Sequence, residues 1–219
     1  MTEQQLLSSL KSAGELLGSG NPAGALRLCK GVMAISPDHP IAATLAGFAL
    51  LELSDLVGAK RYFQRSLESS PKNINARFGL AKVLEAQRLF SEAASHYQRV
   101  CESQPEHNAA KVGYANCCVG LGRFTQALSL FDEVLHSTQD PHLHRNLGIA
   151  YLEQNELAKA EHHLMRLKAL LPDDQDTQSQ LATALLKQER FAEGWPFYEA
   201  RVRNFFQNNE RLFPELPMW

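Results

Sequence analysis

The sequence predicts an all-α fold, a stack of about six antiparallel helix pairs, from three regular series of residues. Small residues recur every 33 or 34 positions, at Ala25, Ala59, Ala93, Ala127, Ala160 and Gly194. A second series lies twelve positions earlier, at Ala13, Gly47, Ala81, Ala115, Gly148 and Ala182. Prolines form the third series: Pro37, Pro71, Pro105 and Pro172 follow the first series by twelve positions, and Pro141 follows it by fourteen.

These spacings have a direct physical meaning for paired helices. Two small residues twelve apart let the backbones of two antiparallel helices approach closely where they cross. Large apolar residues surround them at helical spacing, so that each helix has one buried face. The third repeat has Leu80, Leu84, Phe90, Tyr97 and Val100, and the fifth has Leu147, Tyr151, Leu157, Leu164 and Leu167.

The repeats follow one another along nearly the whole chain. Short breaks such as Gly18 to Asn21, Gly120 to Arg123 and Glu153 to Glu156 fit the turn between the two helices of a pair, and the prolines end the second helix. No Gly/Ser linker divides the array, so we expect one domain over residues 1–208 and a C-terminal tail or severed linker over 209–219. The expected repeats span residues 6–39, 40–73, 74–107, 108–140, 141–174 and 175–208.

The repeated residues resemble the tetratricopeptide repeat (TPR) family, whose pattern is Trp-x2-Leu-Gly-x2-Tyr, then Ala-x3-Phe, then Pro. The fifth repeat matches it through Leu147, Gly148, Tyr151, Ala160, Leu164 and Pro172. The leading tryptophan is replaced by Ser9, Ala43, Arg77, Lys111, His144 and Gln178. The resemblance implies a TPR α-solenoid, a right-handed superhelix of antiparallel helix pairs, whose first helices line a concave groove.

The resemblance to the family implies that this groove is a surface that binds a protein or peptide. Its candidate residues are Thr44, Phe48, Leu51, Asn75, Phe78, Lys82, Val112, Asn116, Arg145, Ile149, Ser179 and Thr183. Ile41, Glu52, Glu85, His142, Leu152 and Asp176 occupy further inward positions. An apolar strip from Phe48, Phe78, Val112 and Ile149 would anchor side chains, while Lys82, Asn116 and Arg145 would set the register. The larger of these residues could instead pack between adjacent repeats.

Two specialised binding modes of the family do not fit this sequence. A clamp for a C-terminal carboxylate needs a converging set of Lys, Asn and Arg, whereas Phe48, Lys82 and Asn116 occupy the equivalent position in successive repeats. The asparagine ladder of the intracellular O-linked sugar transferases is matched only by Asn146.

The composition excludes several classes of function. With 22 basic and 24 acidic residues, the chain has no excess of positive charge for binding nucleic acid. No apolar run approaches the roughly 20 residues of a membrane-spanning helix, and the first residues do not resemble a secretory signal. The four cysteines do not form a disulfide framework, so we expect a cytoplasmic protein.

No catalytic, metal-binding or cofactor-binding constellation is visible. His142 with His144, and His162 with His163, lack the i, i+3 or i, i+4 spacing of a metal pair on a helix, which favours solvated histidines. Cys118 should be buried, and Cys117 is expected to face the edge of the groove. Small core residues are the better interpretation of both, because a mid-helix position does not lower a thiol pKa. We therefore expect no enzyme activity and no cofactor.

The C-terminal end suggests an alternative function. Gly194-Trp195-x-x-Tyr198-Glu199-x-Arg201, followed by Pro214-x-x-Pro217-x-Trp219, resembles the junction where TPR repeats precede a glycosyltransferase-like domain in bacterial proteins. Pro196 belongs near the first turn of a helix. The main hypothesis is a scaffold that holds a partner polypeptide in its groove. The alternative is the substrate-recognition or assembly domain of a larger transferase. The C-terminal segment could equally be a capping helix with an apolar tail folded onto the end of the stack. Self-association through the ends of the stack is left open.

Overall fold

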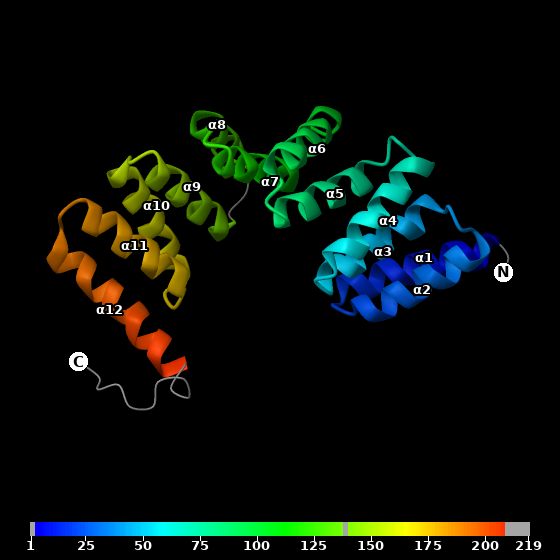
Figure 1. Cartoon of the computed structure of the whole chain (residues 1–219), viewed down its shortest axis with the longest axis horizontal. Coiled ribbons are helices and arrows are strands. Elements are labelled where there is room, and N and C mark those ends of the chain that lie inside the picture. The colour runs from blue at the N-terminus through cyan, green and yellow to red at the C-terminus, as the bar shows by residue number, and fades with distance from the viewer. Residues whose placement is uncertain (1–2, 138–139, 209–219) are drawn as a thin grey trace. The chain divides into compact units, whose positions relative to one another are not determined.

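The computed structural model describes residues 3–137 and 140–208, with side chains up to Glu199. Within these residues the chain forms twelve α-helices and no strands, which confirms the all-α prediction (Figure 1). The helices follow one another in pairs, and we call the first helix of each pair the A helix and the second the B helix. The chain divides into two compact units, residues 1–123 and 124–219.

The first unit contains three complete pairs and one further A helix (Figure 1). Its A helices are α1 (Glu3–Gly18), α3 (Pro40–Glu52), α5 (Ile74–Ala86) and α7 (Asn108–Gly120), and its B helices are α2 (Pro22–Ile35), α4 (Leu56–Ser69) and α6 (Phe90–Ser103).

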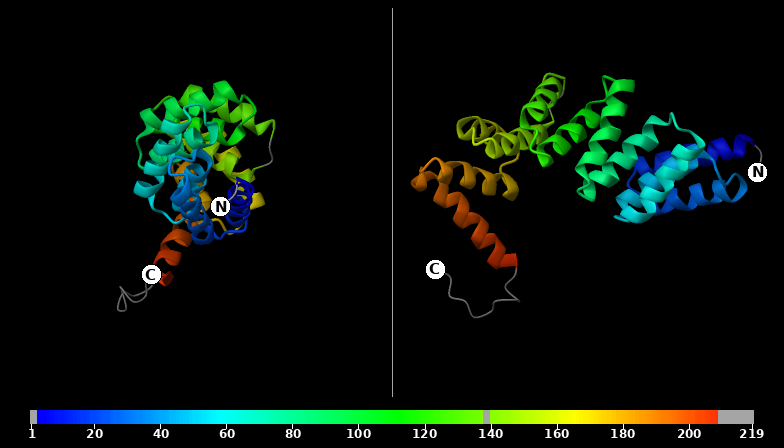
Figure 2. Two further views of the ribbon diagram at one scale, coloured as in Figure 1. Left: turned by 90° about the vertical axis from the view of Figure 1, so that its right-hand side faces the viewer. Right: turned by 45° about the horizontal axis from the view of Figure 1, so that its top comes forward.

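The second unit begins with a B helix and continues with two complete pairs (Figure 2). Its helices are α8 (Phe124–Leu135), α9 (Pro141–Glu153), α10 (Leu157–Leu170), α11 (Gln175–Lys187) and α12 (Phe191–Asn208). The expected C-terminal tail, residues 209–219, lies outside the described residues.

The turns within the pairs share one geometry. The residue at the same repeat position is left-handed in all six described turns: Gly20, Ser54, Arg88, Gly122, Asn155 and Glu189, with φ between 60° and 74°. The next amide then donates back to a carbonyl of the A helix, as Asn21 does to Leu16 at 2.8 Å. This bond satisfies a carbonyl that the end of the helix leaves without an amide. The short breaks seen in the sequence are therefore confirmed as helix-ending turns.

Caps define where the next A helix begins. Asn73 accepts a hydrogen bond from the amide of Ala76, and Asp174 accepts one from the amide of Thr177. His39 caps α3 through its ring Nδ1, which accepts from the amide of Ala42. Each cap satisfies an amide that has no partner within the first turn of its helix. Pro37, Pro71, Pro105 and Pro172 lie in the loops just before caps, as the sequence predicts, whereas Pro141 is the first residue of α9 and follows its capping Asp140.

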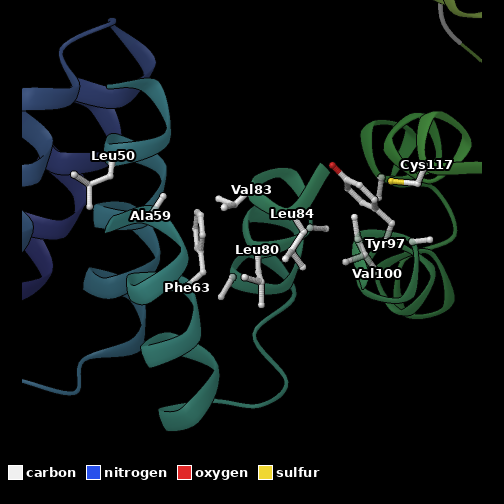
Figure 3. Close-up of a cluster of buried hydrophobic side chains, with 14 residues drawn as sticks. Leu50, Ala59, Phe63, Leu80, Val83, Leu84, Tyr97, Val100 and Cys117 are labelled. Atoms are coloured by element: carbon white, nitrogen blue, oxygen red, sulfur yellow. The ribbon is translucent and has the colours of Figure 1, made fainter. Parts of the chain in front are cut away.

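The core forms where the small residues were expected. Ala25, Ala59, Ala93, Ala127 and Ala160 have no exposed surface, and large apolar side chains pack around them. In the first unit the ring of Phe63 lies between α4 and α5, and the ring of Tyr97 lies between α6 and α7 beside Cys117 (Figure 3). The repeat spacing has therefore predicted the helix crossings of the core.

The last helix differs from its prediction. We expect from the sequence that Pro196 lies near a first turn, but α12 begins at Phe191 and holds Pro196 inside it. Gly194 is buried, and a Cβ there would lie 3.0 Å from the Leu186 side chain, so this turn is packed tightly on α11. Proline removes only one backbone hydrogen bond, and this packing holds the turn that precedes it.

Candidate peptide-binding face

The A helices of each unit form a continuous layer. In the first unit α1 contacts α3, α3 contacts α5, and α5 contacts α7, while in the second unit α9 contacts α11. Among the described residues of each unit, the B helices contact A helices but not one another. When neighbouring helices are in contact along one side of a stack and apart along the other, the stack curves and the side with the contacts is concave. The layer of A helices, which we call the A face, is therefore the inner surface of each unit.

The predicted groove residues belong to both units, and each unit holds its own part of the A face. In the first unit, Asn75 and Lys82 are exposed, Phe48, Leu51, Phe78, Val112 and Asn116 are half-buried, and Thr44 is buried. In the second unit, Arg145, Ile149 and Ser179 are half-buried and Thr183 is exposed.

Thr44 belongs to a buried polar cluster. Its hydroxyl donates to the carbonyl of Pro40 at 2.8 Å and lies 2.8 Å from the hydroxyl oxygen of Ser66. The amide of Asn73 donates to the hydroxyl oxygens of both Thr44 and Ser66, at 2.9 and 3.0 Å. Because Asn73 also caps α5, this cluster joins α3 and α4 to the start of the next A helix.

Two other predicted groove residues stand at the same repeat position as Thr44 and make the same kind of contact. The ring of Phe78 lies 4.7 Å from the ring of His107, which caps α7. Arg145 donates to the carboxylate of Asp174 at 2.7 Å, and Asp174 caps α11. All three side chains therefore brace an A helix against the cap of the next one.

The Arg145 contact also sets the charge of its partner. Burial raises the pKa of Asp174, but hydrogen bonds from the side chain and amide of Thr177, together with Arg145, outweigh it and hold this pKa below its usual value. The Nε atom of Arg145 is buried without a hydrogen-bond partner. Arg145 is thus positioned mainly by its contact with the cap.

Asn116 and Tyr97 hold the carboxylate of Glu85 between α5, α6 and α7. The Tyr97 hydroxyl donates to Oε2 of Glu85 at 2.6 Å, and the Asn116 amide donates to Oε1 at 3.2 Å. Burial, and after it the negative charge of Glu85, raise the pKa of Tyr97 far above its ordinary value. The hydroxyl therefore stays a donor, and this cluster fixes the polar floor of the A face here.

The accessible part of the A face in the first unit includes apolar side chains beside the exposed Asn75 and Lys82. Leu7 and Ile41 stand at the same repeat position and are 59% and 52% exposed. Phe48 packs edge-on against the buried ring of Phe63, with 5.0 Å between the ring centroids. The ammonium of Lys82 lies 5.8 Å from the centre of the Phe78 ring. Sequence reasoning missed Leu7, although its repeat position equals that of Ile41.

The second unit has a shallow depression of about 590 Å³. It is lined by α8, the end of α9 and the start of α10, through Thr125, Leu128, Ser129, Asp132, Glu133, His136, Tyr151, Gln154 and Lys159. None of the predicted groove residues lines it. The ammonium of Lys159 lies 5.5 Å from the centre of the Tyr151 ring and also pairs with Glu156 at 3.5 Å.

The prediction of solvated histidines is wrong for two of the four. The Nδ1 atoms of His144 on α9 and His163 on α10 lie 3.0 Å apart, and His163 stacks on Tyr151. Burial, together with the neighbouring His144 and His162, lowers the pKa of His163 to about 4. The contact joins residues nineteen apart on two helices, so spacing along one helix could not reveal it.

The cysteines are core residues. Cys118 is buried as predicted, but Cys117 does not face the groove edge: it is also fully buried, and it packs in the core cluster with Tyr97 (Figure 3). Burial raises the pKa of Cys117 to about 12 and that of Cys29 to about 11. The cause of the difference is that Cys117 continues the buried stripe of α7, on the same side as Gly113.

In the part of the chain that the structure describes, no group of three or more His, Cys, Asp or Glu side chains is arranged to hold a metal ion. No helix within 3–137 and 140–208 combines the length and apolar character that a membrane span requires.

Comparison with known proteins gives matches to one family of repeats. Two tetratricopeptide repeat models match the sequence, one over residues 44–108 and the other over residues 84–147. A search of curated proteins gives no match.

Solved structures of TPR proteins share the fold. A TPR protein from Parabacteroides merdae is 17% identical, with a TM-score of 0.73 over 91% of this chain and 80% of that chain. PilW, a widely conserved type IV pilus biogenesis factor, is 13% identical, with a TM-score of 0.80 over 93% of this chain and 95% of its own. YrrB, described as a TPR protein with an unusual peptide-binding site, is 20% identical, with a TM-score of 0.64 over 83% of this chain and 90% of its own.

At these identities the structural likeness establishes the fold, and the repeat models establish which repeat it is. The structural likeness and the repeat models both agree with the paired helices of this chain and with the small residues where these helices cross. Residues 44–147 are therefore tetratricopeptide repeats, and the chain shares the fold of solved TPR proteins.

Proposed function

We propose that this protein is a non-enzymatic scaffold that binds a partner polypeptide on the A face of its first unit. TPR proteins in general are protein-interaction scaffolds, and one of the similar structures, YrrB, is described by its peptide-binding site. The observation that carries the proposal is the continuous A-helix layer with accessible apolar side chains at Leu7, Ile41, Phe48 and Leu51. The A face of the second unit, with Ile149, Ser179 and Thr183, is a separate candidate patch.

The chemistry of this face indicates what a partner should offer. Exposed leucine and isoleucine beside half-buried aromatic rings favour apolar anchor residues in the bound segment. Lys82 is an exposed cation beside the Phe78 ring, so an acidic residue near the anchors would be favoured. The bound segment is therefore expected to be an apolar peptide with a nearby Asp or Glu.

Two glycines allow a matched test of this face. Gly14 lies on the A helix α1, at the repeat position of Phe48 and Lys82, and Gly31 lies on the B helix α2. A Cβ added at either site meets nothing within 4 Å, so both sites accept a side chain without a backbone clash. Replacing Gly by Arg within a helix also removes the low helix propensity of glycine.

The measurement is binding of peptides selected from a displayed random library, followed by fluorescence anisotropy on the best binder. Gly14→Arg should weaken binding about tenfold or more, equal to about 1.4 kcal/mol, because its side chain fills the face. Gly31→Arg should leave binding unchanged, and Lys82→Glu should reduce the preference for acidic peptides. Equal binding by the Gly14→Arg and Gly31→Arg variants would refute the proposed face.

The transferase alternative stays a prediction from the resemblance of residues 194–201 and 214–219. Neither family match reaches these residues, and residues 209–219 lie outside the described part of the chain. The reading frame of the parent gene tests it, because a nucleotide-sugar-binding domain encoded after Trp219 would support the alternative.

A further inference from the structure

Two histidines of the fifth pair face one another between helices α9 and α10, which pack together. The Nδ1 atom of His144 lies 3.0 Å from the Nδ1 atom of His163. Both side chains are half-buried, so the pair is not sealed from solvent. The ring of Tyr151 stacks on His163 with 10° between the ring planes, which holds the His163 ring in its orientation. The two nitrogens therefore keep a short separation that the packing of two helices sets.

The repeat shows that this pairing of imidazoles is special to the fifth pair. In the third pair Arg77 and His96 hold the same two positions, and the charge of Arg77 acts on His96. The residues at the two positions in the six successive pairs are Ser9 and Leu28, Ala43 and Tyr62, Arg77 and His96, Lys111 and Leu130, His144 and His163, and Gln178 and Phe197. Only the fifth pair has a metal-ligating side chain at both positions.

The separation of the two nitrogens matches that of two ligands on one metal ion. Bonds between histidine nitrogen and a metal ion are about 2.0–2.1 Å long. Two such ligands lie about 2.9 Å apart if they meet at a right angle, and about 3.3 Å apart if they meet at the tetrahedral angle. The observed 3.0 Å is close to the right-angle value. A right angle is the geometry of tetragonal Ni²⁺ and Cu²⁺ sites, and imidazole suits both ions.

Both histidines are in the protonation state that binds a metal ion. Burial, and after it the charges of Arg166 and His162, lower the pKa of His144, and the pKa of His163 is lowered to about 4. Near pH 7 both rings are therefore neutral. Without a metal ion, Nδ1–H of one ring donates to Nδ1 of the other. When an ion binds, that proton moves to Nε2 of the same ring, so both Nδ1 lone pairs become available and no net proton is released.

The surroundings of the pair determine how many ligands the chain supplies. The ring of His162 packs edge-on against that of His163, with 5.3 Å between the centroids. However, within residues 3–137 and 140–208 no three His, Cys, Asp or Glu side chains are arranged to hold one ion. The charge of Arg166 repels a cation, but this side chain is exposed and water screens it. The chain thus offers two ligands, and water completes the coordination.

We propose that His144 and His163 bind one Ni²⁺ or Cu²⁺ ion through their Nδ1 atoms, with water in the remaining coordination positions. The ion joins the two helices of the fifth pair. The site belongs to the second unit and is independent of the peptide-binding face proposed for the first.

The test uses the full chain, freed of metal with EDTA, titrated with NiCl₂ by calorimetry and melted with and without the ion. Ni²⁺ should raise the melting temperature of the parent protein, because it binds the folded pair. Losing a residue that only orients a ligand weakens metal binding roughly 10- to 100-fold. His163→Phe and His144→Gln, which each lose a ligand, should therefore weaken binding by more than about tenfold and abolish the rise in melting temperature.

Three further variants keep the pair and change its neighbours. His142→Phe, at an exposed position on α9, and His162→Phe should bind Ni²⁺ as the parent does. Arg166→Gln should bind it severalfold more tightly, because a repelling charge is removed. Far-UV circular dichroism of each metal-free variant checks that the helices remain.

The comparison of variants decides whether this pair is the site. Ni²⁺ binding and stabilisation that are the same in the parent, His163→Phe and His144→Gln would overturn the proposal. A loss in His162→Phe or His142→Phe as large as that in His163→Phe would also overturn it, because the ion would then use other ligands.

Discussion

Phe63 and Tyr97 each occupy a space that two neighbouring helices leave open for a ring. Phe63 lies against Gly47 of its own pair and Gly79 of the next, and a Cβ at Gly79 would lie 2.3 Å from the ring. Tyr97 stands in the same relation to Gly113. Gly47 belongs to the predicted small-residue series, but Gly79 and Gly113 do not, because the series marks crossings within a pair, whereas these two glycines mark contacts between pairs.

Substituting alanine for these glycines should therefore destabilise the protein. Gly79→Ala and Gly113→Ala overpack a rigid ring and should each cost about 1–3 kcal/mol, although alanine is the better helix former. At Gly14 and Gly31, where a Cβ has open space, the same change should stabilise by about 0.5–1 kcal/mol. Urea unfolding measures both. The ring contacts would be unimportant if all four variants gained stability.

The His144–His163 contact makes stability depend on pH. Burial lowers the pKa of His144, and the positive charges of Arg166 and His162 lower it further. Burial, His144 and His162 lower the pKa of His163 to about 4. Between that pKa and the ordinary histidine value near 6.5, the unfolded chain binds more protons than the folded one. The stability that the neutral histidine pair contributes to the fold is thus fully present above about pH 6.5 and is lost as the pH falls toward 4.

The variant His163→Phe should remove this dependence and keep an aromatic ring on Tyr151. Thermal melts at several pH values between 7 and 4 should show a smaller loss of stability for the variant than for the parent protein. His142→Phe, at an exposed position on the same helix as His144, serves as the control and should follow the parent. A parallel decline in all three proteins would contradict the assignment to this pair.

At the scale of elements, the turns and caps determine where helices end, and the sequence predicts them well. Gly20 and Gly122 stand where a left-handed residue is needed, and four of the five prolines of the third series lie in the loops between pairs, while Pro141 begins α9. What the sequence did not indicate is that Thr44, Phe78 and Arg145 contact the caps of following helices. A repeat pattern describes one pair at a time, so contacts with a later cap are not visible in it. Alanine at Phe78 or Arg145 would therefore change stability as well as binding.

Four of the six turns place a residue other than glycine in the left-handed region. Arg88→Gly and Glu189→Gly should each stabilise the protein by about 1 kcal/mol, because a Cβ is strained at this φ. Gly122→Ala should cost a similar amount, and Gly18→Ala, at the end of α1 without positive φ, should not. Chemical denaturation of the set provides the measurement. If Arg88→Gly destabilised the protein, the contacts of the arginine side chain would contribute more to stability than the backbone strain at this position costs.

At the scale of the molecule, the number of helix pairs was predictable and the division into two units was not. The repeat spacing continues unchanged through Gly122, the turn just before the boundary at residue 123. The sequence records which helices pair locally, whereas the grouping into units depends on contacts summed over many residues. The A helices form a layer within each unit, while the groove residues and the partner that they bind stay predictions.

Because neighbouring helices provide the contacts of the first unit, residues 1–123 should fold alone. The fragment should show a helical circular dichroism spectrum and cooperative urea unfolding. A shorter fragment, residues 1–107, lacks α7 and with it the cover over Tyr97, and should be less stable by several kcal/mol. Equal stability of the two fragments would mean that α7 does not contribute to the unit.

The glycine beside each ring also fixes the order of the repeats. Gly79 and Gly113 follow pairs that carry Phe63 and Tyr97, whereas Gln180 holds the same repeat position after a pair that carries Leu164. Moving α11 behind α4 would press a glutamine side chain into the ring of Phe63, and moving α5 behind α10 would leave a void beside Leu164. The modules are therefore similar in shape but not exchangeable, and a shuffled array would have to be redesigned at every new junction.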